Sequence, residues 1–391
     1  MTPDQLANAL AELDAQSLRR VRRVLDGPQG VQVTLDGKPY LSFSSNDYLG
    51  LANHPDITLA AQQAAARYGV GAGAAHLLTG HHRLHHELES ELADFVGLPA
   101  ALLFSTGYMA SLGVLPALLD RHGEVFEDKL NHASLVDAAL LSRAKLTRYP
   151  HLDLVSLEQR LASSTAKVKL IATDTVFSMD GDLAPLVELQ ALARRHDAWL
   201  YLDDAHGFGV LGEGGKNGGQ GALALLDDRN DPRLIYLATL GKAAGVAGAF
   251  VGGSAALIEW LVNKARTYVF TTAQPPLLAA AVSASLRLIA ADPWRRAQLI
   301  ELIDRLKAGL AGLPWPLMNS NTPIQPLLVG GNAEALRLAD ALRAQGILLP
   351  AIRPPTVPPG EARLRISLSA AHRLADVDTL CAALQALIPH D

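Results

Sequence analysis

The chain has 391 residues, 49% of them apolar, which is enough for two or three domains with large cores. Its 34 basic and 39 acidic residues give a net charge of −5, which argues against nucleic-acid partners and a membrane-surface role. The single cysteine, Cys381, excludes an internal disulfide and a cysteine-based zinc site, and it fits a reducing, cytoplasmic compartment.

The N-terminal segment is predicted to begin with an amphipathic helix. Leu6, Leu10 and Leu13 recur at helical spacing, with acidic residues between them. The segment has no basic start followed by a long apolar region, so it does not resemble a secretory signal. We expect residues 1–40 to form this helix and a short strand segment.

The central part of the chain alternates between short apolar runs and longer helical patterns. The apolar runs are Ala101–Phe104, Val168–Thr173, Trp199–Leu202 and Leu234–Leu237. This alternation predicts βαβ units and a mostly parallel sheet, in a large α/β domain over residues 41–285. The most apolar window, residues 100–119, is interrupted by Gly, Ser, Thr and Pro, so we expect a buried strand, turn and helix rather than a membrane span.

The last part of the chain, residues 286–391, is predicted to form a small α+β domain. A strand near Ile324–Val329 precedes a helix that begins at Asn332, and further strands and a last helix follow. The segment Arg363–Ser369 alternates strictly between apolar residues and a face with two arginines.

Lys242 is the one charged residue in TLGKAAGVAG (239–248), directly after a predicted strand. The small residues around it would leave room for a molecule bound to the lysine nitrogen. A solvated surface turn is the alternative interpretation.

Two other strand ends carry candidate binding residues. The strand before Asp203 and Asp204 is followed by His206, and ligands of open α/β sheets bind at the carboxyl ends of strands. A carboxylate there could pair with a buried cation, although a solvated loop with an aspartate cap is also compatible. The segment FSTGYMAS (104–111) opens a predicted helix, whose free N–H groups near Gly107 form a candidate anion site.

Four histidines, His81, His82, His85 and His86, suggest a metal site because the i, i+4 pairs could share a helix face. No glutamate stands between them in an HExxH pattern, and no third ligand is evident. We therefore expect an exposed or packing role and no metal. His132 by itself could be an ordinary buried histidine, which is the commoner case for a single histidine.

Together these features match what an enzyme that uses pyridoxal phosphate needs: an amine in a roomy pocket, a carboxylate at a strand end and an anion-binding helix start. Seven segments extend the match. They are SFSSNDYLGL (42–51), FSTGYMAS (104–111), NHASLVDA (131–138), DTVFSMDGD (174–182), LDDAHGFGVLG (202–212), TLGK (239–242) and AIRPPTVPPG (351–360). In these segments the chain resembles the α-oxoamine synthases, which are fold-type I pyridoxal phosphate enzymes. The resemblance implies an aspartate aminotransferase-like fold, with a mostly parallel sheet flanked by helices and a small C-terminal α+β domain.

The resemblance also implies roles around the cofactor ring. Lys242 would bond covalently to the cofactor and act as acid and base at the substrate α-carbon. Asp203 would pair with the pyridine nitrogen, and His132 would stack on the ring and contact the substrate. His206 and Ser178 would bond near the phenolic oxygen of the ring.

The same resemblance assigns the phosphate group to the backbone around Gly107 and Tyr108, together with Thr239. The family is dimeric with active sites at the interface, so Thr272 would reach the phosphate from the second subunit of a homodimer.

For the substrates, the resemblance assigns the amino acid carboxylate to Arg365, with Asn46 in the matching N-terminal motif. Arg20 would lie near the acyl substrate, although Arg19 replaces the family's tyrosine before it and further arginines follow. The prolines of RPPTVPP (353–359) would direct Arg353 and Thr356 toward the acyl chain.

The activity implied is a decarboxylative condensation of L-alanine with a pimeloyl thioester, carried by CoA or by acyl-carrier protein, in biotin biosynthesis. The proline-rich loop favours this reaction over the sister activities that use glycine, 2-amino-3-ketobutyrate CoA ligase and 5-aminolevulinate synthase. A catalytically silent partner subunit would lack the lysine, so the presence of Lys242 argues against it. Ala243 and Ala244 follow the lysine where the family often has glycine and phenylalanine, and their effect on substrate preference stays open.

Overall fold

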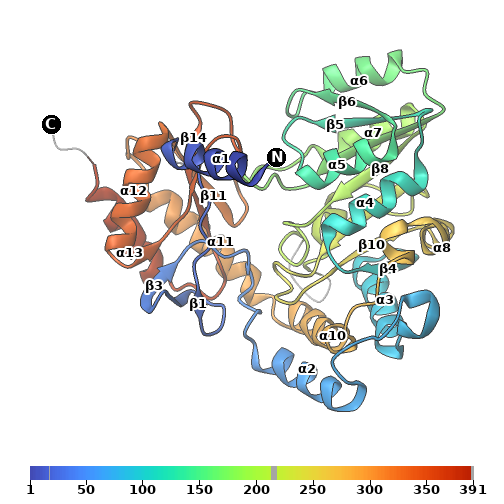
Figure 1. Ribbon diagram of the computed structural model, residues 1–391, viewed down its shortest axis with the longest axis horizontal. Helices are drawn as coiled ribbons and strands as arrows, with labels where there is room; N and C mark the ends of the chain where they lie inside the picture. The colour runs from blue at the N-terminus through green and yellow to red at the C-terminus, as the bar shows by residue number, and fades with distance from the viewer. Residues whose placement is uncertain (17, 213–217, 389–391) are drawn as a thin grey trace.

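A seven-stranded sheet lies at the centre of the larger part of the molecule (Figure 1). The computed structural model describes residues 1–16, 18–212 and 218–388. In spatial order the strands are β4 (Ala100–Phe104), β10 (Ala249–Gly253), β9 (Leu234–Thr239), β8 (Ala198–Asp203), β7 (Val168–Asp174), β5 (Gly123–Asp128) and β6 (Lys145–Tyr149). β10 runs antiparallel to both of its neighbours, β4 and β9, and the other pairs in this sheet are parallel, which confirms the prediction of a mostly parallel sheet.

Helices cover both faces of this sheet, which is why its strands are continuous apolar runs. Along β9, Leu234 and Tyr236 pack into one apolar cluster, whereas Ile235 and Leu237 pack into another on the opposite face. One face is covered by α2 (Pro55–Tyr68), α3 (Arg83–Val96), α6 (Leu154–Ser163), α7 (Leu186–Arg195) and α10 (Pro276–Ala291). The other is covered by α4 (Gly107–Leu118), α5 (Ala133–Ser142), α8 (Ala255–Lys264) and α9 (Arg266–Val269).

Two smaller sheets form the other part of the molecule. The first joins β1 (Leu25–Asp26), β2 (Gln32–Leu35) and β3 (Lys38–Ser42) to β12 (Ile347–Leu348), and the second contains β11 (Ile324–Gly330), β14 (Ala362–Ser367) and β13 (Ala351–Ile352). The helices here are α11 (Trp294–Gly309), α12 (Asn332–Ala344) and α13 (Leu374–Gln385). The predicted strand and helix near residues 324–344 are thereby confirmed.

Neither predicted domain boundary falls in a linker. Residue 40 lies within β3, which pairs in parallel with β12 more than 300 residues later in the chain, and residue 285 lies within α10. Both elements continue across the predicted boundaries: α10 is one continuous apolar helix, and a pairing between strands as distant as β3 and β12 leaves no local signal in the sequence. The division of the chain into domains stays a prediction.

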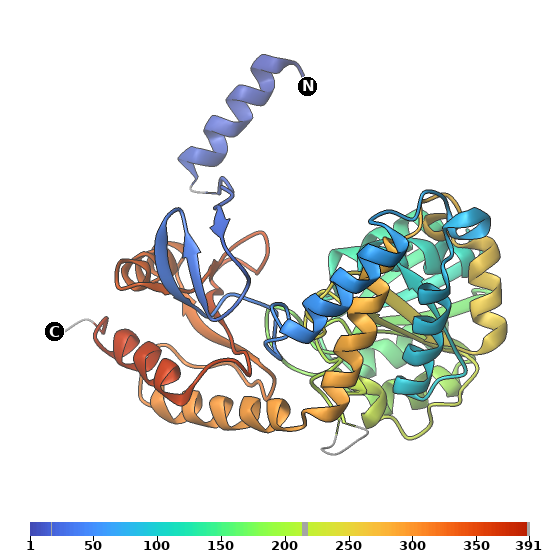
Figure 2. The ribbon, with the colours of Figure 1, turned by 90° about the horizontal axis from the view of Figure 1, so that it is seen from below.

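The N-terminal helix α1 (Pro3–Ala15) projects away from the rest of the chain (Figure 2). Thr2 begins it with a capping box: its hydroxyl accepts from the backbone N–H of Gln5, and the Gln5 side chain bonds back to the Thr2 N–H. The helix is confirmed, but its apolar residues Leu6, Leu10 and Leu13 are exposed rather than packed on a core.

The window at residues 100–119 forms β4 and α4, as expected for a buried strand, turn and helix. Among the described residues, no single helix has the length and apolar character to cross a membrane. The pair α10 and α11, bent by 68°, passes that test only when the two helices are taken together.

Candidate active site

Several of the predicted cofactor residues lie at the carboxyl ends of the sheet strands. β8 ends at Asp203, β9 ends at Thr239, and Lys242 follows three residues later. His132 begins α5 shortly after β5, and Gly107 begins α4 directly after β4. Parallel strands deliver their following loops to the same edge, which is where open α/β sheets bind ligands.

Lys242 begins a chain of hydrogen bonds between side chains. Its Nζ lies 2.8 Å from Nε2 of His206, and Nδ1 of His206 lies 2.7 Å from the hydroxyl of Tyr48. The Tyr48 hydroxyl donates to Oδ1 of Asn46 at 3.1 Å. Because the tyrosine proton is used there, Nδ1 of His206 carries the histidine's proton and Nε2 accepts from the lysine amine.

Burial determines the protonation states of Lys242 and His206 in this hydrogen-bond network. It lowers the pKa of Lys242 to about 8, although Asp203 and Asp174 nearby favour the charged amine. Burial and the charge of Lys242 hold the pKa of His206 well below its usual range, so this imidazole is neutral at pH 7. The lysine is therefore poised to exchange protons near neutral pH.

Asp203 is a buried carboxylate that faces the same space. It accepts a hydrogen bond from the backbone N–H of Ala205 at 3.1 Å. Burial raises its pKa, and the nearby charges of Lys242 and His132 oppose that shift. A buried carboxylate of this kind can bind a protonated ring nitrogen, which is the role that the family resemblance implies and that stays a prediction.

Asp204, the next residue, has a structural role instead. Its carboxylate accepts from the hydroxyls of Thr175 and Tyr236 and from the backbone N–H of Ala222. The two aspartates point in different directions because successive side chains leave a strand on opposite faces. Only Asp203 is thereby available to the site.

His132 is held beside Asp203 by an aspartate that sequence reasoning did not single out. β7 ends at Asp174, in register with Asp203, and Oδ2 of Asp174 accepts the backbone N–H of His132 at 2.9 Å. Nδ1 of His132 lies 2.8 Å from Oγ of Ser134. Burial lowers the pKa of His132, and the charges of Asp203 and Lys242 act on it in opposite directions, so these three groups are close enough to interact electrostatically.

The start of α4 and the end of β9 form a candidate phosphate cradle. Thr106 caps α4 by accepting the N–H of Met109 at 3.1 Å, and a Cβ added to Gly107 would lie 3.9 Å from the Cβ of Thr239. The hydroxyl of Thr239 accepts the N–H of Gly241 and donates to the carbonyl of Gly248. Free N–H groups and a hydroxyl at a helix start suit an anion.

The side chain of Tyr108 does not point into this cradle. Its hydroxyl donates to Asp137 on α5, which leaves only the backbone of Tyr108 for a phosphate. Thr272 is exposed in the segment after α9, and its predicted contribution to a second subunit stays a prediction.

Arg365, Asn46 and Ser178 lie together in the structure, and their roles toward substrate and cofactor stay predictions. The buried guanidinium of Arg365 donates from Nε to the carbonyl of Ser178 at 2.6 Å and from both terminal nitrogens to Oδ1 of Asn46 at 3.3 Å. It also lies 3.5 Å from the Tyr48 hydroxyl, so it joins the chain that leads to Lys242. Tyr48 is the residue that sequence reasoning missed here. It lies inside the quoted segment SFSSNDYLGL, but a loop has no periodicity that would single it out.

The remaining predicted substrate residues line a different hollow. Arg20, Arg353 and Thr356 border a groove of about 940 Å³ between α1 and the loop after β13. Its apolar lining comes from Leu10, Leu13, Pro354 and Pro355. Thr356 also lines a smaller pocket with Asn131, the residue before His132, so the loop spans from the groove toward the sheet edge.

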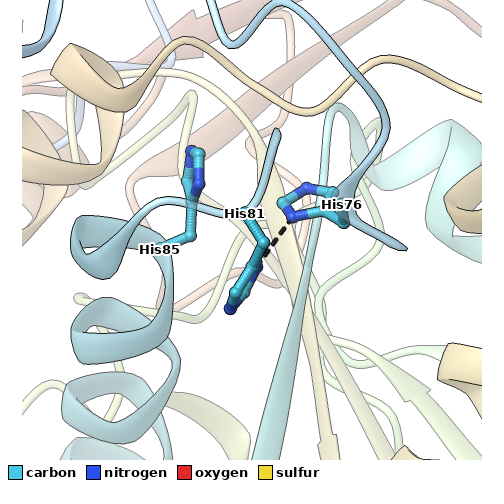
Figure 3. Close-up of side chains that lie close together, drawn as sticks. All are labelled: His76, His81 and His85. Carbon is cyan, nitrogen blue, oxygen red and sulfur yellow. Dashed lines mark hydrogen bonds between the residues drawn. The ribbon is translucent and has the colours of Figure 1, made fainter. Parts of the chain in front are cut away.

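The histidine cluster includes His76, which the sequence did not single out (Figure 3). Nδ1 of His76 lies 2.9 Å from Nδ1 of His81. Ligand atoms of His76, His81 and His85 lie within 4.8 Å of one another, close enough to share a metal ion. However, His85 uses Nε2 on the carbonyl of Gln274 at 2.9 Å and Nδ1 on the N–H of His82 at 3.1 Å.

These bonds give His85 a packing role. Burial lowers the pKa of His85 to about 4 and that of His76 to about 3, so both rings are neutral. The i, i+4 pairs do not share one helix face, because α3 begins at Arg83 and His81 and His82 precede it.

The amine of Lys242, the carboxylate of Asp203 and the start of α4 fit pyridoxal phosphate, because each offers the partner that one part of that molecule needs. Comparisons with known proteins decide the family. The family model for aminotransferase class I and II matches residues 38–384. The chain belongs to this family.

The relatives agree with the α-oxoamine synthase resemblance. The 8-amino-7-oxononanoate synthase of Nitrosomonas eutropha is 60% identical over 391 residues, which cover 99% of each chain. A structure of serine palmitoyltransferase (SPT) with pyridoxal phosphate (PLP) has a TM-score of 0.90 and 28% identity, and the match covers 98% of this chain and 96% of that chain. The 8-amino-7-oxononanoate synthase of Francisella tularensis has a TM-score of 0.75 and 30% identity, covering 89% and 97%. The predicted fold-type I architecture is thereby confirmed.

Proposed function

We propose that the chain is an 8-amino-7-oxononanoate synthase. It condenses L-alanine with a pimeloyl thioester and releases carbon dioxide and the free thiol, a step of biotin biosynthesis. The observation that carries the proposal is the buried amine of Lys242, which lies 2.8 Å from the neutral His206 and interacts electrostatically with the buried carboxylate of Asp203. The choice of substrates rests on the relatives, which share this name at 60% identity over nearly the whole chain.

The cofactor is pyridoxal phosphate, which when bound supplies an electron sink for negative charge at the α-carbon of the amino acid. Lys242 removes the α-proton and later returns a proton, and its pKa of about 8 suits both directions near neutral pH. Asp203 keeps a proton on the ring nitrogen because a buried carboxylate favours a cation beside it. The start of α4 and Thr239 hold the phosphate.

Arg365 and Asn46 bind the carboxylate of L-alanine. A guanidinium offers two parallel donors to a carboxylate, which fixes orientation as well as charge. Since Arg365 is itself fixed by the carbonyl of Ser178 and the hydroxyl of Ser367, it reaches the substrate from a rigid position.

The groove between α1 and the proline-rich loop takes the acyl donor. Leu10, Leu13 and the prolines offer an apolar wall to the carbon chain. Arg20 and Arg353 offer positive charge, which both CoA and a phosphopantetheine-bearing carrier protein can use through their phosphates.

We further propose that the chain acts in the cytoplasm as a homodimer. The one cysteine, Cys381, is buried and free, as in proteins of reducing compartments. The exposed leucines of α1 and the exposed Thr272 support a second copy that covers them and completes the phosphate site.

Substitution of Lys242 tests the assignment of the site. The purified wild type with pyridoxal phosphate is expected to be yellow, and Lys242→Ala is expected to lose both the covalently bound chromophore and turnover. Lys264→Ala, on the exposed surface of α8, serves as the matched control and should retain both. A colourless wild type, or a Lys242→Ala variant that still bonds the cofactor covalently, would refute the assignment.

A further inference from the structure

His151 bridges two aspartates from different loops, next to the site but outside the set of residues assigned above. It lies between β6 and α6, with Nδ1 3.0 Å from Oδ1 of Asp128 and Nε2 2.8 Å from Oδ2 of Asp182. Its ring stands edge-on to Phe177, with ring centroids 4.5 Å apart and an interplanar angle of 90°.

The two partners require His151 to carry a positive charge. An ionised carboxylate only accepts hydrogen bonds, so both ring nitrogens must donate, as they do only in the imidazolium form. Burial by itself would lower the pKa of His151, but the bonds to Asp128 and Asp182 outweigh it and raise the pKa to about 10. Asp180 and its partner Arg363, which also pairs with Glu361, lie beside this bridge.

One partner of His151 shapes the turn that leads to His132. Asp128 ends β5, and its carboxylate also accepts the N–H groups of Leu130 and Leu152, both at 2.8 Å. Its backbone carbonyl accepts the N–H of Asn131, the residue before His132, at 3.1 Å. Movement of Asp128 would therefore shift His132 directly.

The other partner closes the loop that carries Ser178. The carbonyl of Asp182 accepts the N–H of Phe177 at 3.0 Å, and the N–H of Gly181 donates back to Phe177 at 2.8 Å. The carbonyl of Ser178 in this loop anchors Nε of Arg365. The position of Asp182 therefore affects the arginine assigned to the substrate carboxylate.

We propose that His151 is a positioning residue for the active site: as a cation between Asp128 and Asp182, it fixes the loop of His132 relative to the loop of Ser178. The inference rests on the proposed function of that site. Without the imidazolium, two carboxylates would face each other across a partly buried gap, and their repulsion would separate the loops.

The test compares His151→Gln, His151→Arg and the double variant His151→Gln with Asp182→Asn. His122→Gln is the matched control, because His122 is exposed near the opposite, N-terminal end of β5. The readouts are the dissociation constant of pyridoxal phosphate, KM for L-alanine, kcat and the midpoint of thermal unfolding.

His151→Gln is expected to weaken cofactor binding and raise KM for L-alanine by about tenfold each, since a charge-assisted contact on each loop is lost. His151→Arg keeps the charge and two donors, so it should restore much of the loss. The double variant should recover part of it, because removing one carboxylate relieves the repulsion. If His151→Gln does not fold, Asp182→Asn alone is measured instead. It is a milder change and should weaken cofactor binding and raise KM for L-alanine by a smaller factor.

A lower unfolding midpoint in His151→Gln with unchanged cofactor affinity and KM would overturn the inference, because the bridge would then be structural only. Equal losses in His151→Arg and His151→Gln would overturn it as well, since charge would not matter. A wild type that binds no cofactor would refute the proposed function, and this inference with it. A wild type that binds the cofactor while His151→Gln is unaffected refutes the inference alone.

Discussion

Replacing Arg365 by lysine keeps a positive charge in the site but removes the planar fork. In the wild type the guanidinium bonds Ser178, Ser367 and Asn46, which leaves it fixed while it faces the Tyr48 hydroxyl. A lysine has one nitrogen and cannot hold these anchors and also offer two donors to a carboxylate.

A hydrogen bond to a charged group contributes about 1.5–3 kcal/mol. If Arg365→Lys loses one such bond to the substrate, KM for L-alanine should rise by about 10- to 150-fold, since 1.4 kcal/mol corresponds to a factor of ten. The change in kcat should be much smaller, because this contact exists in the ground state as well as the transition state.

The assay is steady-state kinetics with L-alanine varied at a saturating, fixed concentration of pimeloyl thioester. Arg337→Lys, an exposed arginine on α12 paired with Glu334, is the control and should leave both constants unchanged. An unchanged KM in Arg365→Lys, or a loss confined to kcat, would refute the assignment of Arg365 to the substrate carboxylate.

Three further predictions concern titratable groups. Because the pKa of Lys242 is about 8, the rate at which the cofactor-free chain bonds pyridoxal phosphate covalently should rise as pH increases through 8 and then level off; a rise centred near pH 10 would contradict this. Asp203→Asn should lower kcat by about a hundredfold or more with little loss of stability, whereas Asp204→Asn should mainly lower the unfolding free energy, by about 1–3 kcal/mol in denaturant titrations. The pKa of His151 is raised to about 10, so its contribution to the unfolding free energy is complete below pH 6.5 and is lost as pH rises to 10. The loss is up to about 1.4 kcal/mol per pH unit. Parallel curves of unfolding free energy against pH for wild type and His151→Gln would contradict this.

Local patterns in the sequence predicted the helices and strands whose apolar residues recur at one regular spacing and lie in one kind of surroundings. The apolar runs of β7, β8 and β9 are buried on both faces, so each is visible without knowledge of its partners. Lys242 and Asp203 could be singled out because each stands at the end of such a run.

Contacts between distant residues could not be predicted in this way. Tyr48 meets His206 across 158 positions of the chain, and neither residue lies in a repeating pattern. The pairing of β3 with β12 likewise has no local signal, although the two strands are hydrogen-bonded neighbours. The amphipathic pattern of α1 predicted a helix correctly but not what covers its apolar face.

The strand β14 alternates as predicted, but the alternation alone did not indicate the role of its polar face. The segment was expected to have one apolar face and one face with Arg363 and Arg365, and both arginines are in fact buried. Each is held by polar partners from the loop of residues 178–182, so the polar face of this strand is part of the site rather than a solvated surface.

The most direct test of the central claim compares two pairs of substrates on the purified wild type with pyridoxal phosphate. Release of carbon dioxide is measured with L-alanine and a pimeloyl thioester, on CoA and on acyl-carrier protein, and again with glycine and acetyl-CoA or succinyl-CoA. We predict far faster release with L-alanine and at least one pimeloyl donor, accompanied by 8-amino-7-oxononanoate. Faster turnover of glycine with a short acyl-CoA would contradict the proposal and assign the chain to a sister activity.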